Sequence, residues 1–334
     1  MQYELRTQVV EPTRKTFTHL IDRYGDRLAT RYEEGTVDLQ ATEHYHYRPL
    51  WDPSHEIYDE GFSSFKLTDP YSFTDPRQYY YAPYVTSRAT MADAFASTLD
   101  YLDQRSMLQR LPQTWQDLIA DLLLPLRHYE SGAQMICCQG TRFAYGATIA
   151  ACAGFAAFDR IGNAQSISRI GIALAGGTAD LLAEAKTTWL DSETMQPLRR
   201  AIEELLVEPD WAVALIGLDT IDRLMFALLY EHLDDAAIAA GAGTYSLLAQ
   251  HQASWFVDQR KWIDALYAAW CADPEHGGTN KAQLAAAVET ALVTARDGVG
   301  ALAERADHLV SGDSAAAVET TAGSVRDAVK ALTA

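Results

Sequence analysis

Glu43 and His46 are the one pair in the chain with the Glu-x-x-His spacing of a carboxylate-bridged metal site. In a helix this spacing puts both ligands on one face, and a di-iron site in a helical bundle needs two such pairs and two further glutamates. The pair lies in a proline-rich stretch, where no long helix is expected. Glu130 and Glu231, in the predicted central helices, have no histidine three residues later. The sequence therefore predicts no metal ligand set in this chain.

Other histidines and carboxylates give no stronger signal of catalysis. His44, His46 and His55 could form a metal cluster, but histidines in an aromatic segment more often make hydrogen bonds at an interface. His128 and Glu130 could be an acid–base pair, but no nucleophile or metal motif lies near them in the sequence. We therefore predict no catalytic residue and no cofactor-binding residue.

The four cysteines form no C-x-x-C pair. Cys137, Cys138 and Cys152 lie in a run rich in Ala and Gly, where free thiols commonly serve as small core residues. The adjacent pair Cys137 and Cys138 could be redox active or bind a soft metal, but no further ligand at suitable spacing completes such a site. The sequence favours a structural role for all of them, Cys271 included.

Two polar features lie inside predicted helical regions. Asp219 and Arg223, at i and i+4, could form a buried salt bridge at a subunit contact or an ordinary solvated pair. Gly176-Gly177-Thr178 precedes a helix and could bind an anion, although this pattern is more often a tight turn with a Thr cap. Both alternatives remain open for each feature.

A long aromatic segment covers residues 45–84. Pro49, Pro53, Pro70 and Pro76 exclude a long helix there, and so many aromatic rings are not stable in water as a bare loop. Either the segment wraps the rest of this chain or it is an arm that clasps another subunit, and we favour the arm. The predicted interface residues are Tyr45, His46, Tyr47, Arg48, Trp51, Arg77, Tyr79, Tyr80, Tyr81 and Tyr84.

Composition limits the partners. The chain has 334 residues, 48% of them hydrophobic, and a net charge of -18, which repels phosphate backbones and anionic membranes. The first residues contain no apolar leader, and no apolar run reaches the length of about 18 residues that spans a bilayer. We therefore expect a cytoplasmic protein that binds neither nucleic acid nor membrane.

Beyond residue 85 the pattern is helical throughout, with no period-two strand pattern of any length, so the predicted class is all-α. Long, nearly all-apolar helices indicate a ferritin-like bundle that lacks its di-iron ligands. Pro125 predicts a kink or break. The predicted helices cover residues 131–158, 179–190, 196–207, a long stretch opened by Pro209, 244–271, and two amphipathic helices separated by Gly312. The predicted domains are an arm at 1–84, the bundle at 85–275 and C-terminal helices at 276–334.

Several blocks of residues carry a family resemblance, in order from about residue 5 to 270: RYEEGTVDLQATEHYHYRPLWDP, TDPRQYYYAPYV, LLPLRHYESGAQM, FDRIGNAQSISRIGIALAGGTADLLAEAKTTWL and LVEPDWAV. They closely resemble the small (β) hydroxylase subunit of bacterial multicomponent di-iron monooxygenases, with the phenol hydroxylase branch as the nearest match. The chain departs from that branch at Ala82-Pro83 in the tyrosine run, and at Cys137-Cys138, where polar amides are more usual.

The resemblance implies a hydroxylase built as a dimer of αβγ protomers, in which α holds the di-iron centre and β repeats the ferritin-like fold without ligands. It also implies a small regulatory protein and a reductase that carries FAD and a 2Fe-2S cluster and takes electrons from NADH. This chain has no nucleotide-binding glycine motif and no ferredoxin-like cysteine spacing, so we expect those cofactors in the partners.

The sequence thus predicts a noncatalytic structural β subunit that supports an α subunit inserting one oxygen atom from O2 into an aromatic ring, most simply a phenol. One alternative is the small subunit of a related toluene, alkene or alkane monooxygenase. An alternative of another class is a stand-alone enzyme with an unrecognised site.

Overall fold

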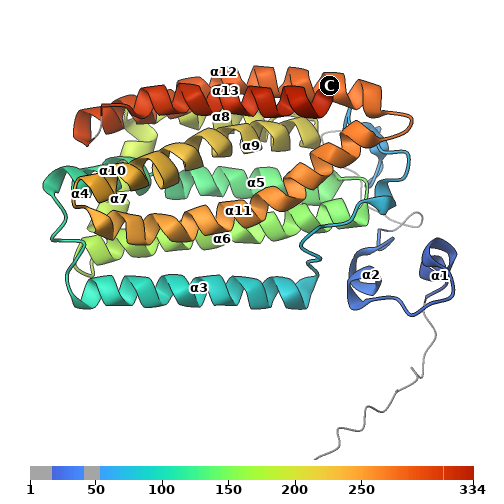
Figure 1. Ribbon diagram of the computed structural model, residues 1–334, viewed down its shortest axis with the longest axis horizontal. Helices are drawn as coiled ribbons and strands as arrows, with labels where there is room; N and C mark the ends of the chain where they lie inside the picture. Colours follow the sequence, from blue (N-terminus) through green and yellow to red (C-terminus); the bar gives the residue numbers. More distant parts are fainter. Residues whose placement is uncertain (1–16, 41–52, 311) are drawn as a thin grey trace, which may run out of the picture.

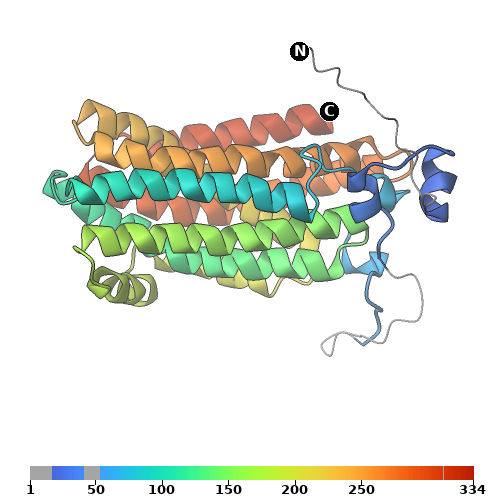
Figure 2. The ribbon, with the colours of Figure 1, turned by 90° about the horizontal axis from the view of Figure 1, so that it is seen from below.

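The computed structural model describes residues 17–40, 53–310 and 312–334, and within these ranges the regular elements are all helices (Figure 1). The all-α prediction is confirmed for this part of the chain. The long helices run side by side along the length of the molecule (Figures 1 and 2). They are α3 (Tyr81–Gln104), α5 (Leu126–Phe143), α6 (Ala147–Leu174), α9 (Trp211–Ala227), α11 (Gly243–Ala272), α12 (Gly277–Leu309) and α13 (Ser314–Thr333).

Shorter elements connect the long helices or flank them. The short α-helices are α1 (Thr18–Tyr24), α2 (Arg31–Thr36), α4 (Gln113–Leu118), α7 (Asp180–Asp191), α8 (Gln196–Leu206) and α10 (Leu233–Ala239). Two 3₁₀ turns, η1 (Glu60–Phe62) and η2 (Pro70–Ser72), lie in the aromatic segment. Two π-helical turns, η3 (Ile119–Leu123) and η4 (Leu228–His232), follow α4 and α9. Among the described helices, none has the length and apolar character needed to cross a membrane.

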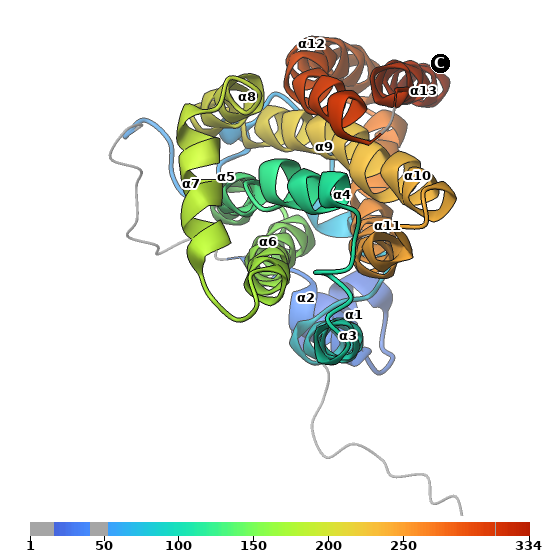
Figure 3. The same cartoon turned by 90° about the vertical axis from the view of Figure 1, so that its left-hand side faces the viewer.

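The bundle has a layered arrangement when seen from its end (Figure 3). Helices α5, α6, α9 and α11 form the middle, α12 and α13 cover α9, and α3 lies on the opposite side against α6 and α11. Helices α5 and α6 approach closely because small residues face each other. A Cβ added to Gly140 would lie 3.2 Å from the Cβ of Ala153. One continuous hydrophobic core includes Phe62, Leu224 and Val299, one residue from each of the three predicted domains.

The single helix predicted for residues 131–158 is wrong, because a turn at Ala144–Gly146 separates α5 from α6. Gly146 has φ +129°, a conformation that side-chain-bearing residues rarely adopt. The turn is held by Gln40, which accepts a hydrogen bond from the Gly146 amide at 2.8 Å and donates one to the Ala144 carbonyl at 2.8 Å. The two helices therefore return along each other and pack as a pair.

The remaining predicted helices agree with α7, α8, α11, α12 and α13 to within a few residues. The helix predicted after Pro209 begins at Trp211, where the Asp210 carboxylate accepts hydrogen bonds from the amides of Ala212 (2.9 Å) and Val213 (3.3 Å). Helix α3 begins inside the tyrosine run. Pro83 is tolerated there because it lies in the first helical turn, where backbone N–H groups have no helical acceptor.

The described part of the aromatic segment packs against its own chain. The Phe62 ring lies 4.7 Å from that of Phe143, and the Phe65 ring lies 4.5 Å from that of Trp270, as centroid distances. The Ser64 amide and hydroxyl both donate to Asp210, at 2.6 and 2.7 Å. Of the two alternatives for this segment, wrapping of its own bundle therefore holds for residues 53–80.

Candidate functional site in the bundle core

A buried arginine lies at the centre of the bundle. Arg160 on α6, with 1% of its side chain exposed, pairs through both terminal nitrogens with Asp222 on α9 and lies 3.4 Å from both carboxylate oxygens of Glu130 on α5. The Tyr129 hydroxyl donates to Asp222 at 2.8 Å. The Trp255 ring, from α11, faces the guanidinium at 5.0 Å. Side chains from four helices thus meet around one cation, and this group of five residues is called the ionic core below.

The ionic core contains one permanent cation and two carboxyl groups. Burial raises the pKa of Glu130 to about 7, against the opposing effect of Arg160. Burial also raises the pKa of Asp222, although Arg160 and Tyr129 favour its charged form. The Arg160–Asp222 pair is neutral as a whole. Glu130 is therefore the group that takes up or releases a proton near neutral pH.

The residues of the ionic core do not fit a di-iron centre. A guanidinium has only N–H donors and no lone pair for a metal, and here it lies between carboxylates from α5 and α9. Across the described ranges, no group of three or more His, Cys, Asp or Glu side chains could hold a metal ion. Glu43, His44 and His46 lie outside those ranges. His55 is described, and its ring packs 5.0 Å from that of Phe62.

The structure separates His128 from Glu130. Glu130 points into the ionic core, whereas the His128 ring stacks near Trp189 of α7, with 6.4 Å between ring centroids. Burial and the nearby Arg127 lower the pKa of His128. The two side chains therefore do not form an acid–base pair.

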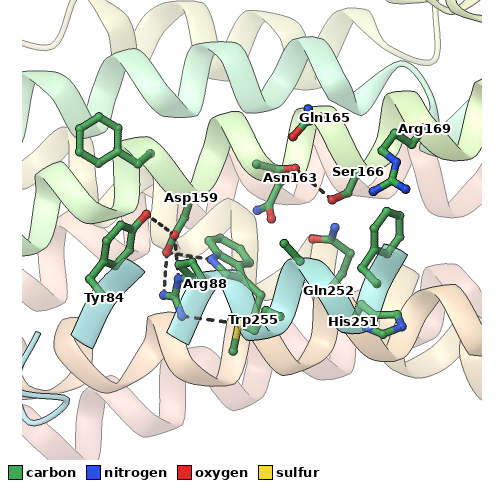
Figure 4. Close-up of a pocket in the computed structure, with 15 residues that line it drawn as sticks. Tyr84, Arg88, Asp159, Asn163, Gln165, Ser166, Arg169, His251, Gln252 and Trp255 are labelled. Atoms are coloured by element: carbon green, nitrogen blue, oxygen red, sulfur yellow. Dashed lines mark hydrogen bonds and ion pairs between the residues drawn. The ribbon is translucent and has the colours of Figure 1, made fainter. Parts of the chain in front are cut away.

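A second ion network joins α3 to the bundle (Figure 4). Arg88 on α3 makes two hydrogen bonds to Asp159 on α6, at 2.8 and 2.7 Å, and one to Asp258 on α11, at 2.8 Å. Asp159 also accepts hydrogen bonds from Tyr84 (2.7 Å) and from the Trp255 indole (3.0 Å). Trp255 thus contacts both the ionic core and this network.

Arg77 lies beside this second ion network. Its side chain is 2% exposed, makes a forked pair with Asp75 and lies 3.8 Å from Asp258. The guanidinium also covers the Tyr79 ring at 4.7 Å. Arg77 and Tyr84 therefore make contacts within this chain, and their place in a subunit interface stays a prediction.

The other predicted interface residues differ in exposure. Tyr81 is 77% exposed, while Tyr79 and Tyr80 are half-buried. The remaining predicted interface residues lie outside the described ranges: Tyr45, His46, Tyr47, Arg48 and Trp51. Tyr81 is thus the predicted contact that the structure leaves most accessible.

Asp219 is buried, but its partner is not Arg223. It pairs with Arg260 on α11 and accepts a hydrogen bond from the Tyr267 hydroxyl at 3.1 Å. Of the two open alternatives, a buried salt bridge therefore holds for Asp219, with Arg260 and not Arg223 as its cation. The i, i+4 spacing within one helix could not reveal a partner on another helix.

The four cysteines differ in burial. Cys137, Cys152 and Cys271 are buried and Cys138 is exposed, and all four are free thiols. Burial raises the pKa of Cys137 to about 12, which disfavours the reactive thiolate.

Gly176 and Gly177 have φ of +66° and +96° and form a tight turn. The Thr178 hydroxyl donates to Asp180 at 2.9 Å, and Ala179 is the N-cap residue of α7. The tight turn is therefore present, but the predicted Thr cap is not.

The fold and the ionic core define the class of protein: a ferritin-like helical bundle with an arginine between the core carboxylates. The chain belongs to the methane/phenol/alkene hydroxylase family, whose model matches residues 51–274. It is 35% identical to the phenol 2-monooxygenase oxygenase component DmpL of Pseudomonas sp. (strain CF600) over 314 residues, 94% of each chain. It is also 22% identical over 276 residues to the hydroxylase component small subunit of propane 2-monooxygenase from Rhodococcus jostii (strain RHA1), covering 80% of this chain and 74% of that one.

A solved structure agrees with these sequence relatives. The structure of xenon-pressurized phenol hydroxylase from Pseudomonas sp. OX1 matches over 98% of both chains, with a TM-score of 0.88 and 31% identity. The predicted family and its phenol hydroxylase branch are therefore confirmed.

Proposed function

We propose that this chain is the noncatalytic small (β) subunit of a multicomponent phenol-type monooxygenase hydroxylase. In this proposal a larger α subunit holds the di-iron centre and inserts one oxygen atom from O2 into an aromatic ring, and this chain supports that subunit. The family membership and the 35% identity to a phenol 2-monooxygenase oxygenase component support the reaction class.

The rest of the proposed system follows from the family resemblance. The hydroxylase would be a dimer of αβγ protomers, to which a regulatory protein and a reductase bind transiently. Electrons would pass from NADH through FAD and a 2Fe-2S cluster in the reductase to the iron in α. In this scheme the chain contributes helix surfaces for assembly and no atom of the reacting centre.

The observation that carries the proposal is the position of Arg160. Its guanidinium already compensates Asp222 and contacts Glu130, so these core carboxylates have a covalently attached cation as their partner. A second cation at the same place would meet repulsion from the guanidinium and would have to displace its hydrogen bonds. This arrangement supports a scaffold role for the bundle.

Metal analysis of the purified chain and of the co-expressed complex tests the proposal. We expect less than one iron per chain in the isolated protein, and about two irons per αβγ protomer in the complex, because the ligand set resides in α. Stoichiometric iron with a di-iron spectrum in the isolated chain would overturn the proposal. Hydroxylation by the chain without its partners would favour the stand-alone enzyme instead.

The substrate class needs a separate measurement. Comparing turnover of phenol, toluene, an alkene and propane by the complete complex discriminates the phenol-type assignment from the toluene, alkene or alkane alternatives. Phenol as the substrate with the highest kcat/KM is the expected result.

A further inference from the structure

A pocket of about 190 Å³ lies between α3, α6 and α11, beside the ionic core, and the second ion network forms one of its walls (Figure 4). Much of its wall is aromatic or thioether surface, from Met91, Phe95, Phe158 and Trp255. Two buried amide side chains complete it, Asn163 on α6 and Gln252 on α11, and a third amide, Gln165, lies at its exposed rim. An apolar cavity of about 150 Å³ is enough to hold benzene, so one substituted benzene ring fits this volume.

The pocket contains a polar group that lacks a partner. Asn163 is 6% exposed, and its amide nitrogen has no hydrogen-bond acceptor in the part of the chain that the structure describes. Figure 4 shows this side chain pointing into the space between the three helices. Hydrogen bonding by Asn163 lowers the pKa of Glu130, but the contact falls outside ordinary hydrogen-bond geometry, so the amide nitrogen keeps unused donor capacity. Buried donors of this kind are rare in proteins, and an acceptor on a bound molecule would satisfy this one.

The charges that line the pocket are already compensated or lie at its edge. Arg88 is held by Asp159 and Asp258. Burial lowers the pKa of His251, which favours its neutral ring, and the ring lies 2.9 Å from the Thr98 hydroxyl. Arg169 is 39% exposed and lies 5.5 Å from the centroid of the Phe95 ring. The interior therefore favours a neutral ligand over an anion.

We infer that this pocket binds a neutral monocyclic phenol, with the ring among the aromatic side chains and the hydroxyl oxygen accepting a hydrogen bond from Asn163. The Gln252 side chain, on the facing helix, also lines the pocket, and its amide oxygen offers an acceptor for a hydrogen bond from the hydroxyl. The pocket chemistry selects a small aromatic alcohol, and the choice of phenol as the physiological ligand rests on the proposed function. The site is a second place for phenol, on a chain that does not hold the reacting centre.

Crystals of the co-purified complex soaked with 4-bromophenol give the direct test, because bromine has an anomalous signal. We expect a bromine peak within this pocket in addition to any peak in a partner subunit. A fluorine NMR titration of the complex with 4-fluorophenol tests binding in solution. A peak found only elsewhere, or binding seen only at the concentration used for the crystals, would overturn the inference.

Matched variants identify the site in that titration. Ala92 lines the pocket and Ala94, on the same helix, does not. Ala92→Phe should weaken this binding step about 10-fold or more by filling the space, whereas Ala94→Phe should change it less than about 2-fold. Asn163→Leu, which removes the donor, should weaken it about 5- to 10-fold, and Gln165→Leu at the exposed rim should have little effect.

The outcomes separate this inference from the proposed function. Equal affinities for all four variants would overturn the pocket assignment even if the chain co-purifies with α. Tighter binding of benzoate than of phenol would indicate a carboxylate ligand near Arg169 and would overturn the neutral-phenol assignment. Failure to co-purify with α would contradict the proposed function. Phenol binding in the pocket is measured separately on the full chain, so its result does not depend on co-purification.

Discussion

At the scale of single residues, Arg160 joins side chains from four helices. A buried ion pair is weak evidence for net stability, because desolvation of both charges offsets their attraction. Removal of one partner is different, since it leaves the other charge buried and uncompensated. Glu130 and Asp222 both face Arg160, so its removal leaves two buried carboxyl groups without their cation.

Arg160→Met therefore tests the ionic core, because methionine keeps much of the side-chain volume and removes the charge. We expect a loss of about 3–5 kcal/mol in the free energy of unfolding, measured by urea denaturation. The control is Arg200→Met, whose side chain is 80% exposed and pairs with Glu204 on the same helix. This control should lose less than about 0.5 kcal/mol.

A combined variant separates charge from packing. If uncompensated charge causes the loss, Glu130→Gln and Asp222→Asn added to Arg160→Met should recover most of it. A combined variant as unstable as Arg160→Met alone would show instead that the shape of the guanidinium, and not its charge, holds the core together.

Glu130 makes stability depend on pH. Its pKa is about 7 in the folded protein against an ordinary value of 4.5, so the folded state keeps this proton where the unfolded state has lost it. The contribution of Glu130 to the free energy of unfolding therefore falls as the pH rises from about 4.5 to about 7. Glu130→Gln cannot ionise, so its stability relative to the natural chain should increase over this range, by about 2–3 kcal/mol between pH 5 and pH 8.

Unfolding of both proteins by urea across this pH range measures the effect, because all other titrating groups are shared and cancel in the difference. A difference that stays constant from pH 5 to pH 8 would show that Glu130 does not titrate in this window.

At the scale of elements, the turn between α5 and α6 is tightly constrained. A Cβ at Gly146 would lie 2.7 Å from the Pro70 carbonyl oxygen, and φ is +129°. Gly146→Ala should therefore lower the free energy of unfolding by about 2–4 kcal/mol, since backbone strain and the steric clash both oppose it.

Gly300 provides a control of opposite sign. It lies inside α12, and a Cβ there would meet nothing within 4 Å. Gly300→Ala should raise the free energy of unfolding by up to about 1 kcal/mol, because alanine is the better helix former. Urea denaturation of both variants makes the comparison, and loss of stability at both positions would contradict this account of the turn.

The contrast between these elements shows what the sequence could predict. Helices α7, α8 and α11 follow from apolar residues at helical spacing, a signal that is local. The turn at Gly146 was missed because both flanking helices are rich in small apolar residues, so the pattern does not change across it. Its cause, the contact with Gln40 and Pro70, joins residues far apart in the chain.

The ionic core was missed for the same reason. Arg160 is 30 residues from Glu130 and 62 residues from Asp222 along the chain, so no spacing rule connects them. One signal was available: Asp159 and Arg160 are adjacent charged residues in a long run of small apolar ones. Such charges require partners, but the sequence does not say which residues supply them.

At the scale of the whole molecule, α3 offers a surface suited to a partner. It packs mainly against α6 and α11 and leaves its other sides open (Figure 3). Between residues 81 and 99 its charged residues are Arg88, which is turned inward, and Asp93. Tyr81 and Val85 are 77% and 42% exposed on the first turns of this helix. Exposed aromatic and apolar side chains on a weakly charged face are typical of protein interfaces.

Tyr81→Ala combined with Val85→Ala should therefore weaken assembly with the proposed α subunit, by about 2 kcal/mol or roughly 30-fold in Kd. The matched control is Tyr101→Ala, a 49% exposed tyrosine towards the other end of α3. Co-purification yields and phenol turnover measure the two effects. Activity should fall in proportion to the complex lost, and the complex that remains should keep a near-normal kcat, since this chain is proposed to supply no reacting atom. Full assembly with a hundredfold lower kcat would instead place this end of α3 in an active site and contradict the scaffold role.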